Sequence, residues 1–419
     1  MPRISLITIG NELLKGRIVN TNATDIADLL RRHGYGLDRV LTVADTGEDI
    51  RQALVQEMAL SDVVLTSGGL GPTRDDITKH TLAALFDSEL VWDADTLAFL
   101  ELRYRDTPQS LTELTRQQAL VPARASVLPN PLGTAPGLCF SERGKLVFVM
   151  PGVPFEMLRM LEHEVLPRLA SAYPSSRYFH QILRLIDIPE SLVAVRMEDI
   201  ENRKPEHIGI SYLPREDGIW LEIGIHVPAG DGEAGMHELE GWVAQARQLF
   251  ADTLYATGEQ SPAQLLLVHL QQQGLRIAIA ESMTGGRIAA RLVEVAGASN
   301  SLTGAVTAYD VAVKTTLLGV DPGLIDEAGV VSQAVATEMA AGVRRLLGAD
   351  IGLATTGIAE ATDTEKARVW IGYADAHGTD AVELGLRYRR VVNLDRATQY
   401  ALIFALKKVR SNFGASAGF

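Results

Sequence analysis

Two stretches of this sequence combine glycines with residues that can bind anions or attack carbonyl groups. The first begins at Ser67, reads Ser-Gly-Gly-Leu-Gly-Pro-Thr-Arg-Asp-Asp, and follows the apolar run 63–66. Its glycines let the backbone approach a ligand, so that several N–H groups can point at one phosphate. Two adjacent acids suit a divalent cation that bridges carboxylates to phosphate oxygens. A plain glycine turn with an aspartate as helix cap also fits. The residues concerned are Gly68, Gly69, Gly71, Asp75 and Asp76.

The second stretch, Glu-Ser-Met-Thr-Gly-Gly from Glu281, follows the apolar run 277–280 and precedes an amphipathic segment. This order predicts a strand, a polar glycine turn and a helix. Ser282 is then held above a helix N-terminus, where it can serve as a nucleophile if a base lies beside it. The alternative is that Ser282 or Thr284 only caps the helix.

Strands and helices alternate around the first glycine stretch, which predicts a parallel sheet covered on both faces. Strand-like runs occupy residues 4–9, 37–43 and 63–66, with helical patterns at 24–32 and 47–58 between them. Ligands of such sheets bind at the carboxyl ends of the strands. Polar residues at those ends should therefore converge, namely Gly10, Asn11, Glu12, Asp45 and the segment 67–76.

Composition limits the classes of function. The 419 residues carry a formal net charge of −13. At ~100–200 residues per domain this length predicts two to three domains. An acidic chain gains no bulk electrostatic help in binding nucleic acid or an anionic membrane. The single cysteine, Cys139, excludes an intramolecular disulfide and fits a cytoplasmic location. No signal-peptide pattern or membrane-spanning apolar run is found in the sequence.

The middle of the chain, residues 171–258, reads as a small α+β module of strand-helix-strand-strand-helix order. Residues 177–258 contain seven Lys and Arg against fourteen Asp and Glu, and no Gly-x-x-Gly clamp lies between two helices. We therefore expect a spacer or dimerisation module and no nucleic-acid ligand.

Four motifs in order carry a resemblance to a known family. They are Gly-Asn-Glu-Leu-Leu at residue 10 with Asn-Thr-Asn at 20, the glycine stretch at 67, Asn-Pro-Leu-Gly-Thr-Ala-Pro-Gly at 130 and Pro-Gly-Val-Pro-Phe-Glu-Met at 151. Together they resemble the CinA (competence/damage-inducible) family. The resemblance implies an α/β protein of three domains: a parallel-sheet, molybdopterin-binding-like domain (1–170), a small KH-like α+β connector (171–258) and a deamidase-like α/β domain (259–415).

For the first domain, the resemblance implies a metal-dependent pyrophosphatase that acts on ADP-ribose. Phosphate would be held by the glycine loop with Thr73 and Asn22, and a divalent ion (Mg, Mn or Co) by Asp45, Asp75 and Asp76. Glu12 and Asp76 are the implied catalytic residues. The residues themselves do not single out a general base, for which Glu12, Asp45 and Glu156 all remain open.

For the last domain, the resemblance implies a nicotinamide mononucleotide deamidase without a cofactor. Ser282 would be the nucleophile, assisted by Tyr309 and Lys314, and the products would be nicotinate mononucleotide and ammonia. A lysine of lowered pKa, or one acting through the tyrosine, can take the serine proton. Backbone N–H groups of Gly285 and Gly286 are candidate oxyanion donors. The implied nucleotide-binding residues are Thr284, Gly285, Thr356 and Arg396.

The sequence departs from the family pattern after residue 359. A glycine-rich loop is replaced there by Glu-Ala-Thr-Asp-Thr-Glu-Lys-Ala-Arg, starting at Glu360. Its three acids would repel a phosphate instead of holding it. The altered loop therefore argues against nucleotide binding in the last domain, whereas the loop of the first domain keeps all of its glycines.

Both end domains point to salvage of pyridine nucleotides in the cytoplasm by a homodimer that uses small-molecule nucleotides and no membrane. Two alternatives stay open. One is a non-catalytic regulatory protein linked to competence or the DNA damage response. The other is a molybdopterin-binding protein, which rests on the analogy of fold alone.

Overall fold

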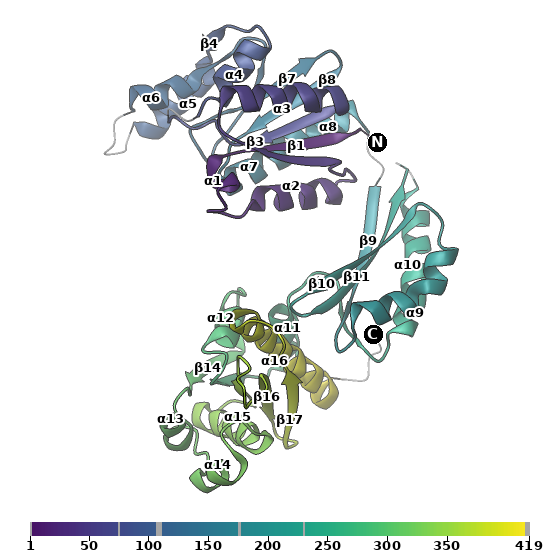
Figure 1. Cartoon of the computed structure of the whole chain (residues 1–419), viewed down its shortest axis with the longest axis vertical. Coiled ribbons are helices and arrows are strands. Elements are labelled where there is room, and N and C mark those ends of the chain that lie inside the picture. The colour runs from purple at the N-terminus through teal and green to yellow at the C-terminus, as the bar shows by residue number, and fades with distance from the viewer. Residues whose placement is uncertain (1, 74–75, 106–110, 175–176, 229–230, 415–419) are drawn as a thin grey trace. The chain divides into compact units, whose positions relative to one another are not determined.

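The structure is a computed structural model and describes residues 2–73, 76–105, 111–174, 177–228 and 231–414 (Figure 1). The chain divides into two compact units, Met1–His180 with Gly224–Glu240, and Gln181–Ile223 with Gly241–Phe419. Within the described ranges, no helix has the length and apolarity needed to cross a membrane.

The first part is built on a six-stranded sheet of order β2-β1-β3-β8-β7-β6. Strands β2, β1, β3 and β8 are parallel, as the sequence predicts. Strands β7 and β6 run antiparallel, which the prediction of a parallel sheet missed. The reason is local: only Arg143 and Gly144 separate β7 from β8, both at positive φ, and so short a turn can join only antiparallel neighbours. The strands are β1 (Ile4–Ile9), β2 (Arg39–Val43), β3 (Val63–Ser67), β6 (Ser126–Leu128), β7 (Gly137–Glu142) and β8 (Lys145–Met150).

Helices cover both faces of this sheet (Figure 1). In β1, Ile4 and Leu6 pack with α2 and α7, whereas Ile7 and Ile9 pack with α3 and α4 on the opposite face. Apolar side chains on both faces are what a strand inside a doubly covered sheet requires. The helices are α1 (Asn11–Leu14), α2 (Thr21–Arg32), α3 (Gly47–Leu60), α4 (Thr78–Leu85), α7 (Pro154–Met160), the π-helical η2 (Leu161–Val165) and α8 (Leu166–Ala172).

Residues between α4 and β6 form a separate two-stranded sheet with short helices, which the periodicity of the sequence did not predict. Its strands, β4 and β5, are only three residues long, too short for an alternating pattern to be recognised. The elements are β4 (Leu90–Trp92), α5 (Ala94–Tyr104), α6 (Glu113–Arg116), η1 (Gln117–Ala119) and β5 (Leu120–Pro122).

The middle of the chain has the expected strand-helix-strand-strand-helix order and one further strand, β12. Its sheet has the order β10-β11-β9-β12. Strand β12 pairs antiparallel with β9. The elements are β9 (Arg177–Leu185), α9 (Glu190–Arg203), β10 (Ile208–Arg215), β11 (Gly218–Val227), α10 (Gly232–Leu249) and β12 (Leu254–Thr257).

The last domain is a five-stranded sheet of order β14-β13-β15-β16-β17. One face packs on α11, α12 and α16, and the other on α15. Helix α15 approaches the sheet closely because Gly352 faces it: a Cβ there would lie 1.9 Å from the carbonyl oxygen of Ala340. The elements are α11 (Pro262–Gln273), β13 (Ile277–Glu281), α12 (Arg287–Val293), η3 (Ala298–Asn300), β14 (Leu302–Thr307), α13 (Val311–Thr316), α14 (Pro322–Ala328), α15 (Gln333–Leu347), β15 (Ile351–Ile358), β16 (Arg368–Ala374), β17 (Thr379–Gly385) and α16 (Arg390–Phe413).

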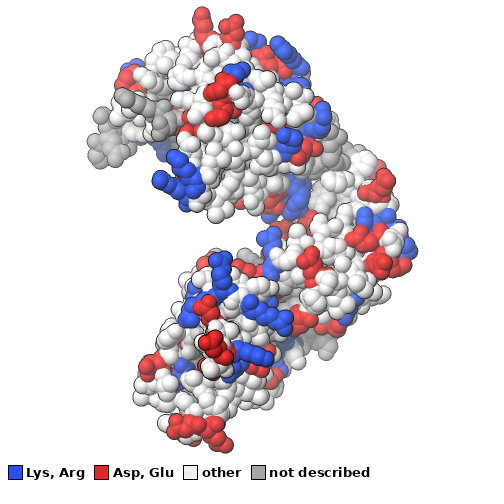
Figure 2. Space-filling model, viewed as in Figure 1, with Lys and Arg blue, Asp and Glu red and all other residues white. Residues whose placement is uncertain are grey.

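Charged residues of both signs are interspersed on the face of the molecule shown in Figure 2. Such mixing is the pattern of a solvated surface, whereas a nucleic-acid surface concentrates Lys and Arg.

Candidate functional site

The carboxyl ends of the parallel strands of the first part bring the predicted polar segments to one edge. Asn22, on α2, donates from its side-chain amide to Ser67 Oγ at 2.9 Å and to the Gly152 carbonyl at 2.8 Å. Ser67 in turn donates to the Pro151 carbonyl at 3.1 Å. Asn22 thus ties the glycine loop after β3 to the Pro-Gly turn after β8, instead of being free to bind phosphate.

The glycines after β3 are required by geometry. Gly68 and Gly69 adopt φ angles of 115° and 70°, which disfavour any side chain. A Cβ on Gly69 would lie 2.0 Å from Thr78 Oγ1, and one on Gly71 would lie 2.5 Å from Asp76 Oδ2. The loop therefore folds back tightly on the start of α4, as both the phosphate-loop and the turn interpretations require.

The carboxylates proposed as metal ligands have protein partners. Asp76 Oδ2 accepts from the Thr73 backbone at 2.9 Å and its hydroxyl at 2.6 Å, and Asp45 accepts from the Asn11 side-chain amide. Asp75 lies outside the described residues. Among the side chains that the structure places, no three from His, Cys, Asp and Glu come together to hold a metal ion. Of the three proposed ligands, the structure describes Asp45 and Asp76, which do not complete a metal site without Asp75.

Glu12, the other implied catalytic residue of this edge, is exposed at the start of α1. Its carboxylate lies against the backbone of Gly10, where a Cβ would be 2.4 Å from Glu12 Oε1. A second carboxylate of the region, Glu156, accepts from the side-chain amide of Asn130 at 2.7 Å.

In the last domain, the structure brings Ser282 and Lys314 into contact. Lys314 Nζ donates to Ser282 Oγ at 3.0 Å, although 31 residues separate them in the chain. Strand β13 ends at Glu281 and presents Ser282, and α13 carries Lys314 to the same place. The lysine is 1% exposed and Ser282 8% exposed. A nucleophile in direct hydrogen-bond contact with a candidate base is the geometry that covalent catalysis needs.

The Lys314 amine has no carboxylate within the contacts that hold it. It also donates to the backbone carbonyls of Ala308 at 2.6 Å and Tyr309 at 3.2 Å. Burial lowers the pKa of Lys314, and the negative charge of Asp310 offsets this only in part. The lowered pKa makes the neutral amine, the form that can accept a proton from serine, easier to reach than it is for a lysine in water.

Tyr309 takes a different place from the relay position that the sequence left open. Its side chain is 64% exposed, and its hydroxyl lies 3.4 Å from Arg390 Nη2. The hydrogen bond that Lys314 makes to this tyrosine goes to its backbone carbonyl, not to its hydroxyl. Direct contact between Lys314 and Ser282 makes a tyrosine intermediary unnecessary. Tyr309 and Arg390 instead lie at the mouth of the cavity in front of the serine.

Glu281, which the sequence analysis did not select, holds the turn that carries Ser282. Its side chain is completely buried. Its two carboxylate oxygens accept from the backbone N–H groups of Gly286 at 3.0 Å, Ile288 at 3.1 Å and Ala289 at 2.9 Å. A carboxylate at a helix N-terminus satisfies amides that lack intrahelical partners and favours the helix dipole. The sequence signal was an acid placed immediately before a polar turn and a helix.

This capping corrects two predictions for the turn. Gly286 N–H donates to Glu281 and Gly285 N–H to the Ser282 carbonyl at 3.2 Å, so neither amide is available as an oxyanion donor or to a nucleotide. Thr284 is fully buried, with its hydroxyl 2.8 Å from that of Thr355. It supports the sheet and has no surface for a ligand.

A cavity of about 560 Å³ opens in front of Ser282. Thr356 lines it, and so does Glu360, the first of the three acids in the altered loop; Asp363 and Glu365 do not line it. Arg390 contributes the positive charge. The sequence selected Arg396 instead, which lines a different cavity. Arg396 is six positions beyond Arg390 on α16 and leaves the helix on another side.

Asn393 connects this cavity to the start of α16. The side chain is completely buried, and its amide donates to the carbonyls of Ala359 at 2.8 Å and Tyr388 at 2.6 Å. Its oxygen accepts from the Tyr388 N–H at 3.0 Å. Ala359 lines the Ser282 cavity, so one amide side chain fixes the loop of the cavity to the segment that precedes the helix.

Comparison with known proteins finds a family model for each end of the chain. Residues 5–171 match the model for a probable molybdopterin binding domain, and residues 259–409 match the CinA C-terminal domain. A CinA-like protein of Flavobacterium psychrophilum is 32% identical over 98% of this chain and 99% of its own length. A CinA-like protein of Chlorobium phaeovibrioides is 37% identical over 86% of this chain and 84% of its own length. The chain belongs to the CinA family.

A solved structure of the protein CinA from Thermoplasma acidophilum is 42% identical. The match covers 38% of this chain and 94% of the Thermoplasma chain, with a TM-score of 0.36.

We predict that Glu281→Gln lowers the free energy of unfolding by ~1–3 kcal/mol, because an amide oxygen replaces a carboxylate that accepts three hydrogen bonds and its NH₂ group faces donors. Chemical denaturation measures the loss. Glu294→Gln, at the exposed end of the same helix, is the matched control and should change stability little. Equal effects of the two substitutions would contradict the capping role.

Proposed function

We propose that the last domain hydrolyses the carboxamide of a nicotinamide nucleotide, with Ser282 as nucleophile and Lys314 as its base. The single observation that carries the proposal is the 3.0 Å contact between Lys314 Nζ and Ser282 Oγ inside a buried site. The family resemblance in the sequence supplies the substrate class. A lysine of lowered pKa in contact with a serine hydroxyl supports acyl transfer on chemical grounds alone.

The proposed reaction has two steps. Lys314 takes the proton of Ser282 while the serine oxygen attacks the carboxamide carbon, and the resulting ammonium returns the proton to the leaving nitrogen, which departs as ammonia. Water then attacks the acyl-serine, again with Lys314 as base, to release a carboxylate and restore the serine. The net change is amide plus water to carboxylate plus ammonium, since the ammonia takes up the proton that the new carboxylic acid releases.

The charges of the cavity suit the two ends of such a substrate. Glu360 on one loop favours a cationic pyridinium ring, and Arg390 at the mouth favours a phosphate. The sequence suggested that three acids of the altered loop would repel a phosphate. Only one of the three, Glu360, lines the cavity, so the expected repulsion is smaller. The size of the cavity, about 560 Å³, lies within the range of small-molecule sites, ~300–1,000 Å³.

We expect Ser282→Ala and Lys314→Met each to reduce ammonia release from nicotinamide mononucleotide by about 10³-fold or more, since the two residues act as one unit. A coupled ammonia assay on the full chain gives the rates. Lys79→Met changes a lysine of the first domain and serves as control, with the rate retained. Wild-type protein that folds but releases no ammonia would refute the activity.

The rate should also depend on pH in a defined direction. Because the base acts unprotonated and burial lowers its pKa, kcat/KM should rise with pH to a plateau, with an inflection below the ordinary lysine value of ~10.4. The pH–rate profile of the wild type gives the inflection. In Lys314→Arg the group stays protonated at every accessible pH, so no inflection or activity is expected. An inflection at or above the ordinary value would exclude Lys314 as base.

A second activity, hydrolysis of the pyrophosphate of ADP-ribose, is proposed for the first domain. The observation that favours it is the convergence of the glycine loop with the Pro-Gly turn through Asn22 at the carboxyl edge of the parallel strands. That edge is where ligands of α/β sheets bind. A divalent ion, held in part by Asp75 and Asp76, remains part of this proposal.

AMP release from ADP-ribose in the presence of Mg²⁺, Mn²⁺ or Co²⁺ tests this second activity. Asp76→Ala should abolish it, since the loop between Thr73 and Asp76 loses its closing hydrogen bonds as well as a carboxylate. Glu101→Ala, an exposed acid on α5, is the control and should leave the rate unchanged. No turnover with any of the three ions would refute the proposal, and binding of molybdopterin without hydrolysis would favour the alternative ligand.

A further inference from the structure

A second cavity of the last unit, of about 360 Å³, lies apart from Ser282. It is formed by the loop 186–190, the hairpin 214–219 that joins β10 to β11, and side chains at the end of β17 and along α16. Arg396 and Tyr388 line it, with Tyr400 further along the helix. It shares none of its lining residues with the Ser282 cavity.

Two arginines of this cavity are held by aromatic rings. The guanidinium carbon of Arg396 lies 5.2 Å from the centroid of the Tyr388 ring, and that of Arg215 lies 5.4 Å from the centroid of Trp220. Among the residues that the structure describes, neither arginine forms an ion pair. The ring attracts the cation through its π face, and the guanidinium keeps N–H donors that can bind a planar or tetrahedral anion.

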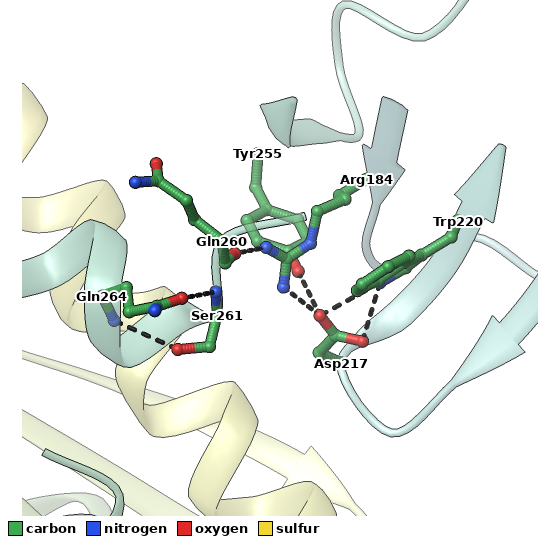
Figure 3. A network of polar contacts seen from close by, with 7 residues as sticks. All are labelled: Arg184, Asp217, Trp220, Tyr255, Gln260, Ser261 and Gln264. Carbon is green, nitrogen blue, oxygen red and sulfur yellow. Dashed lines mark hydrogen bonds and ion pairs between the residues drawn. The ribbon is translucent and has the colours of Figure 1, made fainter. Parts of the chain in front are cut away.

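Two of the acids at the cavity already have partners. Figure 3 shows that the carboxylate of Asp217 is surrounded by Arg184, Tyr255 and Trp220. It accepts from the Tyr255 hydroxyl at 2.7 Å and from Trp220 Nε1 at 3.0 Å, and it pairs with the buried Arg184 guanidinium. Asp187 accepts from the Tyr400 hydroxyl at 2.8 Å, with Lys407 Nζ at 3.9 Å. Asp217 is thus paired with a buried guanidinium, whereas the charge of Asp187 is offset only by Lys407 at the edge of ion-pair range.

Two other acids, Glu190 and Glu216, line the cavity as well. They would oppose a bare anion, but carboxylates are good acceptors for the hydroxyls of a ribose. Tyr388, whose side chain is 58% exposed, offers an aromatic surface to a planar base. The lining therefore combines donors for a phosphate, acceptors for a sugar and a ring for a base.

We propose that this cavity is a binding site for a nucleoside monophosphate. Arg215 and Arg396 hold the phosphate, Glu190 or Glu216 accepts from the ribose hydroxyls, and the base stacks on Tyr388. The volume of about 360 Å³ lies in the range of small-ligand sites, ~300–1,000 Å³. The site includes neither Ser282 nor the glycine loop, so nucleotide binding here does not depend on either proposed hydrolytic activity.

Isothermal titration of the full chain with adenosine 5′-monophosphate tests the proposal. We expect saturable binding that weakens by about tenfold or more in Arg396→Gln and in Arg215→Gln, because each loses a charge-assisted hydrogen bond to the phosphate. Arg345→Gln, an exposed arginine on α15 that lines neither cavity, is the matched control and should bind as the wild type does. Arg215 is exposed on its hairpin, so its substitution tests binding without disturbing the core.

Two further titrations separate the parts of the ligand. Adenosine alone should bind at least about tenfold more weakly, since it lacks the phosphate that the arginines hold. Inorganic phosphate alone should also bind more weakly than the nucleotide. Phosphate that binds as tightly as the nucleotide would overturn the assignment of the nucleoside. Nucleotide binding that is absent, or unchanged in both arginine variants, would overturn the site.

Discussion

The buried carboxylate of Glu281 is the contact on which the candidate site of the last domain depends. An anion removed from water must be satisfied by the protein, and here three backbone N–H groups at the start of α12 do so. Because those groups belong to the residues that follow the turn, the carboxylate ties the end of β13 to the helix. Ser282 lies between these two fixed points, and its orientation toward Lys314 follows from them.

The two glycine turns of the chain look alike as sequence but differ as structures. After β3, two glycines at positive φ pack against Thr78, and the loop is closed by Asp76 on Thr73. After β13, an internal carboxylate occupies the helix N-terminus, where an external phosphate would otherwise bind. The same local pattern is thus capped by a protein carboxylate after β13, whereas the N-cap residue of α4 makes no side-chain capping bond. In the second turn the reactive group is the Ser282 hydroxyl, which contacts Lys314.

Much of this arrangement was accessible from the sequence. Apolar runs predicted the central strands, and the order of strands and helices placed the polar loops at one sheet edge, because periodicity reports burial directly. The antiparallel direction of β6 and β7 was missed because a two-residue turn leaves little signal, and β4 and β5 were missed because three residues are too few for a periodic pattern. Arg396 was assigned to the wrong cavity and Arg390 overlooked, because the direction of a side chain on a helix depends on where the helix begins.

The position of two arginines on α16 has a mechanical consequence. Arg390 and Arg396 are six positions apart, which at ~100° per residue turns one side chain about 240° from the other. They therefore leave the helix on different sides and enter different cavities. Asn393 lies between them and binds the backbone of Ala359. Any rotation of this end of the helix would displace both arginines together, because both belong to the first turns of α16.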